Sequence, residues 1–467
     1  MRHVSKLTIL LVSASMLAGC AGGGLFKKKP KTRVLGDRIA VLVNEADIEI
    51  DPATAAIPVS LPAAAVNDSW AQSGGNARKS VGHVALGSSL GVAWTASIGQ
   101  GSSNKGRLGG GPVVADGRVY TIDTAGTVRA FDARNGGQVW SARFGDIGNN
   151  SGAVYGGGVA YDNGRVYATN GLGYVAALDA TNGAAVWTVR PGGPLRGEPS
   201  VSGDAVYVMS QDNQIYSLKT ADGSTNWSNA AALEIAGVFG SAAPSIGQGT
   251  VVAGFSSGEL NAYRYENGRQ VWQDALSRTS ITTSVASLSD IDADPVIDSG
   301  VVYAVGQGGR MVALDLFSGQ RIWELNFAGI ATPWVAGDWV FAVNDRAQLV
   351  AIARSTGKIK WINQLPRYEH MKDKKGPISY VGPVLAGDRL ILAGSNGALI
   401  NVNPTDGSVQ SQIDLKDGVS FQPVVANNTL YLLTDSGRLI AYRYSSLRGA
   451  LATRQSSCGW IASLRSQ

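Results

Sequence analysis

PVVADGRVYTIDTAGTVRAFDARNGGQVW, residues 112–140, is one complete unit of the repeat that decides the fold. Its alternating apolar positions predict four short strands, at 112–115, 118–123, 128–132 and 138–142. Asp116-Gly117 and Asn135-Gly136 mark the first and last turns, because such pairs favour the positive φ of tight hairpins. The unit is therefore expected to be a four-stranded antiparallel sheet.

The same unit recurs along the chain with two markers in a fixed register. In seven copies a Gly lies four residues before a strand residue that is usually Trp: Gly136/Trp140, Gly183/Trp187, Gly223/Trp227, Gly268/Trp272, Gly319/Trp323, Gly357/Trp361 and Gly407/Ser411. A second residue opens each copy, Pro in seven and Val in one: Pro112, Val159, Pro199, Pro244, Pro295, Pro333, Pro383 and Pro423. Eight copies in one register are typical of a β-propeller.

The eighth copy is incomplete at its own end of the chain. It supplies strands at 423–426, 430–433 and 439–442 but no fourth strand. Residues 92–98, which include Trp94, match the missing Trp-bearing strand. A blade built from both termini closes the ring and removes open edges. We therefore predict an all-β, eight-bladed propeller of four-stranded antiparallel blades over residues 67–445, with the repeated Trp side chains packed between blades.

The first twenty residues have the pattern of an export signal. Basic residues precede the apolar run 7–17, which is too short for a membrane span. The sequence Leu17-Ala18-Gly19-Cys20 resembles the lipobox of bacterial lipoproteins, which implies a signal peptide at 1–19 and acylation of Cys20. An ordinary secreted protein with an accidental Cys20 is the alternative.

The lipoprotein interpretation also predicts where the chain resides. Ala21 stands where an inner-membrane retention signal usually has Asp, so the expected location is the periplasmic face of the outer membrane. Residues 20–66, with a basic cluster at 27–33, are expected to form a flexible lipidated tether. Residues 446–467 are expected to be a disordered tail.

Composition and motifs argue against most chemistry. A net charge of +5 over 467 residues, with no basic stripe interleaved with aromatics, excludes a nucleic-acid footprint. Three His and two Cys offer little for a metal or an active site. Asp290-Ile-Asp292 resembles the start of a calcium loop, but Pro295 and Val301 replace the Gly and Glu that such a loop needs. We expect no catalytic residue, no metal and no cofactor.

The repeat resembles that of a known propeller family. Arg118-Val-Tyr120, Val175-Ala-Ala-Leu-Asp179 and Gly319-Gln-Arg-Ile-Trp323 are similar to the repeats of quinoprotein alcohol dehydrogenases over roughly residues 88–443. Two groups share this repeat: enzymes that bind pyrroloquinoline quinone (PQQ), and BamB-type lipoproteins of the outer-membrane β-barrel assembly machinery. The adjacent Cys pair and the calcium ligands of the enzymes are not recognisable. The resemblance therefore favours the BamB-type group, a non-enzymatic scaffold.

That resemblance implies a partner and a set of contact residues. In BamB-type proteins an acidic loop before the fifth blade docks a periplasmic POTRA domain of the barrel-forming subunit. Here Asp290 and Asp292 take that role, with Leu288 as an apolar contact. Phe239, on the loop before the fourth blade, is a further candidate. Leu195-Arg-Gly-Glu198 matches a family contact motif but lies one blade too early in the repeat register, so no role is assigned to it.

Three further roles stay open at this point. Exposed blade edges are candidates for transient pairing with unfolded outer-membrane proteins. A lipid-anchored PQQ-dependent quinoprotein dehydrogenase is the main alternative to the scaffold. A propeller that binds sugar or peptidoglycan is neither supported nor excluded.

Overall fold

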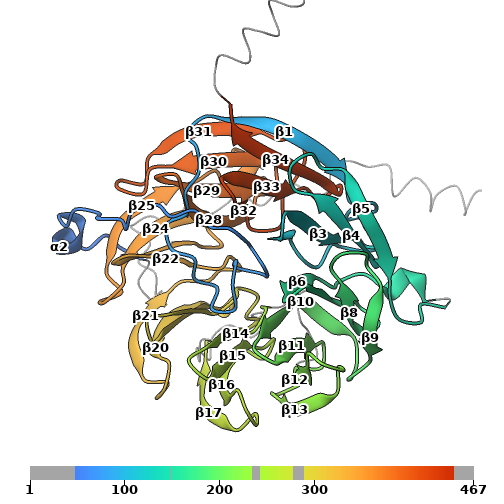
Figure 1. Ribbon diagram of the computed structural model, residues 1–467. Helices are drawn as coiled ribbons and strands as arrows, with labels where there is room; N and C mark the ends of the chain where they lie inside the picture. Colours follow the sequence, from blue (N-terminus) through green and yellow to red (C-terminus); the bar gives the residue numbers. More distant parts are fainter. Residues whose placement is uncertain (1–47, 149, 234–241, 277–288, 446–467) are drawn as a thin grey trace, which may run out of the picture. The chain divides into compact units, whose positions relative to one another are not determined.

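Eight four-stranded antiparallel sheets surround a central channel in the computed structural model of this chain (Figure 1). The structure describes residues 48–148, 150–233, 242–276 and 289–445. In seven blades the strands follow the chain from the channel outward, and in the eighth the outer strand is β1 (Leu90–Ser97). The predicted eight-bladed propeller is confirmed.

The bounds of the elements are as follows. Blade 1 has β2 (Val113–Ala115), β3 (Arg118–Ile122), β4 (Thr127–Asp132) and β5 (Gln138–Arg143); blade 2 has β6 (Val159–Asp162), β7 (Arg165–Thr169), β8 (Val175–Asp179) and β9 (Ala185–Val189). Blade 3 has β10 (Leu195–Ser202), β11 (Ala205–Ser210), β12 (Gln214–Lys219) and β13 (Thr225–Ala230); blade 4 has β14 (Ser245–Gly247), β15 (Thr250–Gly254), β16 (Glu259–Arg264) and β17 (Gln270–Ala275). Blade 5 has β18 (Val296–Asp298), β19 (Val301–Val305), β20 (Arg310–Asp315) and β21 (Arg321–Asn326); blade 6 has β22 (Trp334–Ala336), β23 (Trp339–Val343), β24 (Gln348–Ala353) and β25 (Ile359–Gln364). Blade 7 has β28 (Tyr380–Ala386), β29 (Arg389–Gly394), β30 (Ala398–Val402) and β31 (Val409–Asp414); blade 8 has β32 (Val424–Ala426), β33 (Thr429–Leu433) and β34 (Arg438–Tyr444) beside β1.

Three small elements lie outside the blades. They are the one-turn helix α2 (Pro52–Ala55), the 3-10 turn η1 (Ser151–Ala153), and the hairpin of β26 (Tyr368–His370) and β27 (Lys375–Pro377). Within the described residues, no helix has the length and hydrophobicity that crossing a membrane requires.

The eighth blade is closed by the N-terminal strand, as the sequence predicted. β1 pairs antiparallel with β34 from Leu90 opposite Tyr444 to Ser97 opposite Arg438. The Trp94 ring lies 5.9 Å from that of Tyr431 on β33, so the borrowed strand contributes to the core of the blade as well as to its edge.

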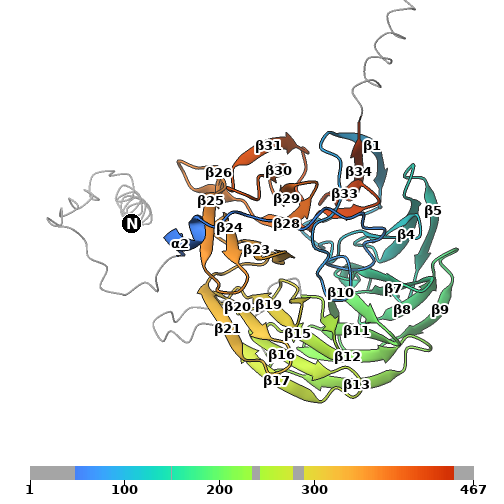
Figure 2. The ribbon, with the colours of Figure 1, turned by 60° about the vertical axis from the view of Figure 1, so that its left-hand side comes forward.

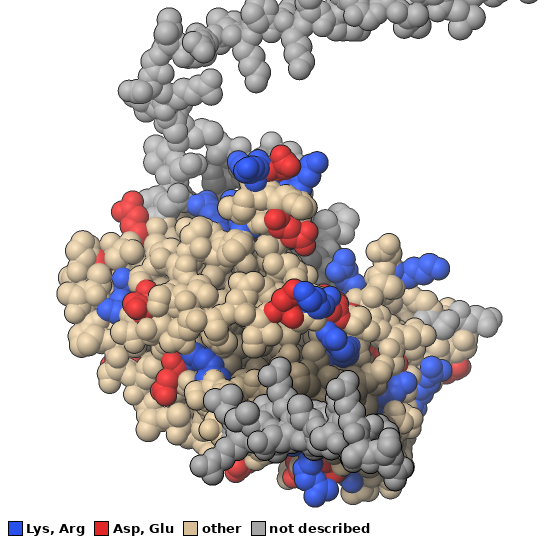
Figure 3. All heavy atoms as spheres, turned by 90° about the horizontal axis from the view of Figure 1, so that it is seen from above, with Lys and Arg blue, Asp and Glu red and all other residues tan. Residues whose placement is uncertain are grey.

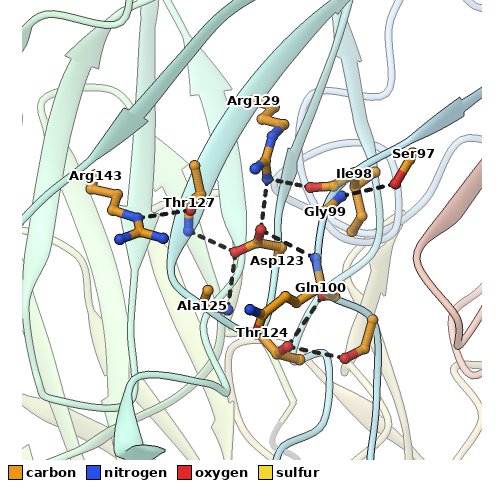
Figure 4. Close-up of polar contacts among 11 residues, drawn as sticks. Ser97, Ile98, Gly99, Gln100, Asp123, Thr124, Ala125, Thr127, Arg129 and Arg143 are labelled. Atoms are coloured by element: carbon orange, nitrogen blue, oxygen red, sulfur yellow. Dashed lines mark hydrogen bonds and ion pairs between the residues drawn. The ribbon is translucent and has the colours of Figure 1, made fainter. Parts of the chain in front are cut away.

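A buried carboxylate then fixes the chain as it leaves β1 for blade 1. Asp123 accepts hydrogen bonds from the backbone N–H of Thr127 at 2.9 Å and of Gln100 at 3.3 Å (Figure 4). Arg129 donates both to Asp123, at 2.7 Å, and to the carbonyl of Ile98. Because a buried carboxylate needs such partners, Asp123 ties the end of β1 to the second and third strands of blade 1.

Neighbouring blades are joined by one repeated contact. The Trp of each outer strand donates from Nε1 to a carbonyl of the next blade at 2.8–3.1 Å: Trp94 to Ala133, Trp140 to Ala180, Trp187 to Thr220, Trp227 to Tyr265, Trp272 to Leu316, Trp323 to Arg354 and Trp361 to Pro404. The marker Gly of that next blade lies against the indole with φ of 71–78°. A Cβ there would come within 2.5–2.8 Å of the ring, so only Gly fits.

This contact explains why the seventh copy has Ser411 where the others have Trp. The receiving carbonyl and Gly belong to the turn between the third and fourth strands of the next blade. In blade 8 the fourth strand comes from the other end of the chain, so that turn does not exist. A Trp at position 411 would have no turn to pack against.

Residues 67–87, called here the inner segment, line the channel and bond to every blade (Figure 1). Its contacts, in chain order, are Asn67 with Val425 and Asn427, Trp70 with Val114, Ala71 with Tyr161, Gln72 with Val201, Ala77 with Ile246, Arg78 with Ile297, Gly82 with Trp334, and Val84 with Leu385 and Gly387. These partners lie on or next to the innermost strands, whose edges would otherwise present unpaired backbone groups to the channel. The inner segment therefore covers the edges that face the channel.

Residues 48–57 lie against the outer edge of blade 6, as Figures 1 and 2 both show. The N–H of Asp51 donates to the carbonyl of Ile359 at 2.9 Å, and Lys360 Nζ donates to the carbonyl of Ala55 at the same distance. Asp51 also caps α2 through the N–H of Thr54. This part of the predicted flexible tether is thus attached to the propeller, because it supplies backbone partners to an open sheet edge.

Replacing Trp94 with Ala should destabilise the ring at its closure. The substitution removes an 8% exposed side chain and its bond to Ala133, and such losses cost about 3–5 kcal/mol. Val92→Ala in the same strand is the matched control, since Val92 is 59% exposed and should change the free energy of unfolding by less than about 0.5 kcal/mol. Denaturant unfolding measures both, and equal effects would contradict the role given to Trp94.

Candidate functional site

The channel opens at one end into a cavity of about 430 Å³. Its walls are loops that lead into the innermost strands, such as Gly109–Pro112, Thr332 and Val419–Gln422, together with turns such as those of Gln307 and Asp435. Trp70, Ser73 and Gly74 of the inner segment form its floor. The lining includes apolar side chains, such as Leu108, Val381 and Phe421, and several carboxylates.

Three charged side chains meet beside the floor. Lys79 of the inner segment is 2% exposed, and its Nζ donates to Ser200 Oγ at 2.9 Å. Asp294 is 6% exposed and accepts from Ser73 Oγ at 2.5 Å and from the N–H of Ala243 at 2.7 Å. Glu198 faces the cavity and accepts from the N–H of Gly111 at 2.5 Å. The cluster thus joins the inner segment to blades 1, 3 and 5.

Burial changes the protonation of two of these groups. Desolvation raises the pKa of Glu198 to about 8, and the nearby charge of Asp294 acts in the same direction, against the bond from Gly111 and the charge of Lys79. Desolvation likewise lowers the pKa of Lys79, against the attraction of Asp294 and Glu198. The cluster is therefore poised to hold a proton on Glu198 at neutral pH.

Glycines make the space for Glu198. A Cβ on Gly110 would lie 2.7 Å from Glu198 Cγ, and one on Gly158 would lie 2.3 Å from it. Gly157 pairs with Gly197 in an isolated bridge, which brings these backbones together. The close approach of Glu198 thus explains Gly110 and Gly158, while Gly109 and Gly157 are required by the nearby backbone of Gly156 and Thr169.

The predicted acidic loop lies at the cavity mouth, between blades 4 and 5. Ser289 Oγ donates to the carbonyl of Ser256 at 3.0 Å, and the N–H of Ile291 donates to the carbonyl of Phe255 at 3.2 Å. From the other side, Gln307 donates through its backbone to the carbonyl of Asp290 and through Nε2 to the carboxylate of Asp292. The loop is therefore fixed to the turns of both blades.

The two aspartates differ in exposure. Asp290 is only 1% exposed, so its side chain is not presented at the surface as a docking contact requires. Asp292 is partly exposed and lines the cavity. Leu288, Phe239 and Cys20 lie outside the described residues, as do the signal peptide and the C-terminal tail.

Comparison with known proteins places the chain in a family. The model of a family described as outer membrane protein assembly factor BamB matches residues 82–149 and 124–363. The chain belongs to the BamB family. The BamB of Vibrio cholerae is 30% identical over 348 residues, 74% of this chain and 86% of that protein. The BamB of Escherichia coli K12 is 29% identical over 389 residues, 74% of this chain and 87% of that protein.

Solved structures with the same fold come from both groups that share the repeat. The crystal structure of BamB from Moraxella catarrhalis has a TM-score of 0.62 at 21% identity and covers 77% of this chain and 98% of that one. A quinohemoprotein alcohol dehydrogenase from Comamonas testosteroni has a TM-score of 0.61 at 14% identity, covering 82% of each chain. At these identities the structures show the propeller fold alone, whereas the sequence matches show the BamB family.

Sequence reasoning missed the charged cluster. It set Leu195-Arg-Gly-Glu198 aside because of its register, whereas the structure places the partly buried Glu198 in the cavity lining, where it accepts from the N–H of Gly111. Lys79, Gly111, Glu198 and Asp294 are far apart in the sequence and share no motif. The two Gly-rich runs were the available signal, since three small residues before an innermost strand indicate a close neighbour.

Glu198→Gln should flatten the dependence of stability on pH. Because the pKa of Glu198 is raised from 4.5 to about 8, the folded protein keeps a proton that the unfolded chain loses. The free energy of unfolding therefore falls as the pH rises from about 4.5 to about 8, and the neutral Gln removes this contribution. Denaturant unfolding at several pH values in this range measures the effect. Parallel curves for the two proteins would contradict it.

Proposed function

We propose that this chain is a non-enzymatic accessory protein of outer-membrane protein assembly. Its membership of the BamB family carries the proposal, because the curated relatives it matches over most of their length are named as outer membrane protein assembly factors. In this proposal acyl chains on Cys20 hold it at the periplasmic face of the outer membrane. Both the location and the anchor rest on the family and on the sequence of residues 1–20.

The proposed partner is the POTRA region of the barrel-forming subunit, bound at the loop of residues 289–292. The loop lies beside the cavity and is fixed on both sides, so it holds the partly exposed Asp292 carboxylate in place for a basic partner. In this proposal the buried Asp290 stabilises the loop, and Asp292 makes the contact with the POTRA domain. Leu288 and Phe239 remain proposed apolar contacts.

The cavity does not suit the cofactor of the dehydrogenases. PQQ has three carboxylates, whereas the residues lining this cavity include the carboxylates Asp292, Asp294 and Asp435, besides the protonated Glu198, against Arg107. A trianion would meet like charge on most sides. Among the described residues, no group of three or more His, Cys, Asp or Glu is arranged to hold a metal ion. The lining therefore favours the scaffold over the quinoprotein alternative.

A second proposed role uses the outer edges of the blades. Val139, Val186, Val271 and Ile322 each precede the marker Trp on an outer strand, and all are exposed. Such an edge can add one strand of an unfolded outer-membrane protein through backbone hydrogen bonds. The isolated parallel bridge between Ile50 and Ile359 at the edge of blade 6 supports this role, because there a backbone segment from outside the blade already bonds to an outer strand.

Asp292→Lys should sharply reduce co-purification of the barrel-forming subunit with this protein. Charge reversal at the cavity mouth replaces attraction with repulsion, and such changes at an interface typically cost tenfold or more in affinity, about 1.4 kcal/mol. The control is Asp338→Lys, an exposed carboxylate in the turn between β22 and β23. Unchanged co-purification with Asp292→Lys would remove this loop from the interface.

A further inference from the structure

The hairpin of β26 and β27 is a defined element that extends from the propeller between blades 6 and 7. Tyr368 pairs with Pro377, and His370 pairs with Lys375. Two hydrogen bonds hold its base. The N–H of Ile378 donates to the carbonyl of Arg367 at 3.0 Å, and the hydroxyl of Tyr380 donates to the carbonyl of Pro366 at 2.9 Å. Ile378 and Tyr380 are themselves buried. The hairpin therefore has a fixed base and an open tip.

The tip combines positive charge with an apolar side chain. Between residues 367 and 375 the hairpin carries four basic residues, Arg367, Lys372, Lys374 and Lys375, against Glu369 and Asp373, and all six are exposed. Met371 lies at the turn and is 60% exposed. Figure 3 shows one face of the molecule, on which basic and acidic side chains are scattered over a largely uncharged surface. The hairpin thus presents an exposed apolar residue within a segment that has a net excess of two positive charges.

The hairpin belongs to the same side of the ring as the attached N-terminal segment. Residues 48–57 bond to β25, and β25 leads directly into the hairpin, as Figure 2 shows. The part of the chain that connects to Cys20 therefore leaves the described structure beside blade 6. If acyl chains anchor Cys20, the anchored end and the cationic hairpin leave the propeller at neighbouring blades.

We infer that this hairpin is a second membrane contact, which binds anionic phospholipid headgroups while Met371 enters the interface. The inference rests on the proposed outer-membrane location. Ammonium groups around a protruding apolar tip suit a diffuse negative surface, because lysines are attracted without fixed geometry and the thioether buries apolar area. A carboxylate-specific protein partner would instead be recognised by bidentate arginines in a shaped pocket.

Vesicle binding by the chain from residue 20 onward, with Cys20→Ala to remove acylation, tests this contact. We expect binding to vesicles of phosphatidylcholine mixed with phosphatidylglycerol, weakened by salt, and little binding to phosphatidylcholine alone. The triple variant Lys372→Glu, Lys374→Glu, Lys375→Glu should lower the affinity roughly tenfold or more. The control reverses three exposed cations on blades 3 and 4, Lys219, Arg264 and Arg269, and should bind like the parent protein.

Two further variants separate the sources of binding. Met371→Asp should weaken vesicle binding without changing thermal unfolding, whereas Met371→Leu, which keeps an apolar side chain, should bind vesicles like the parent protein. Lys27→Glu, Lys28→Glu, Lys29→Glu tests the basic cluster of the N-terminal region. If that variant alone loses binding, or if equal binding to neutral vesicles is found, the hairpin is not the lipid contact. A hairpin variant that keeps vesicle binding but loses the assembly partner would identify a protein contact and overturn the inference.

The vesicle assay also distinguishes this inference from the proposed partner site. Asp292→Lys should leave vesicle binding unchanged, and the hairpin triple variant should still co-purify with the barrel-forming subunit in detergent. A failure of the partner proposal would therefore appear in co-purification, and a failure of the hairpin proposal in vesicle binding.

Discussion

The hydrogen bond from each marker Trp to a carbonyl of the next blade is the contact on which this ring depends. It joins the outer strand of one blade to the last turn of its neighbour, and the Gly of that turn lets the indole approach. Because the indole is buried, its N–H must find a partner, which fixes each blade against the next. A Trp occurs wherever the next blade has a turn between its third and fourth strands to receive it, which accounts for the seven Trp contacts and for Ser411.

A second constraint acts at the centre of the ring. Innermost strands present their edges to the channel, and the inner segment satisfies them blade by blade. Lys79 of this segment donates to Ser200 and lies near the Asp294 carboxylate and the protonated Glu198. Since the same segment floors the cavity, the shape of the candidate site and the closure of the channel are set by the same residues. The floor of the cavity comes from the N-terminal region, whereas most of its walls come from the repeated blades.

Periodicity made most of the fold predictable, and its absence explains what was missed. The repeat register gave the eight blades, the closing strand at Trp94 and strand bounds close to those observed, because each strand obeys the same local rules. The inner segment has no repeat, and its partners are spread over the whole chain. Exposure was equally hard to foresee: Asp290 and Asp292 look alike in sequence, yet the Asp290 side chain is buried in the loop while that of Asp292 is partly exposed and lines the cavity.

The eighth blade is built from both ends of the chain, which affects the order in which the protein can fold. A chain that emerges amino-terminus first releases the inner segment and β1 long before β34, the partner of β1, is available. β1 cannot pair until β34 arrives, and the inner segment cannot make its contact with blade 8, through Asn67, before then. A chain that stops short would leave every earlier blade intact and still be unable to close. Closure of the ring therefore requires a chain that extends at least to the end of β34, at Tyr444.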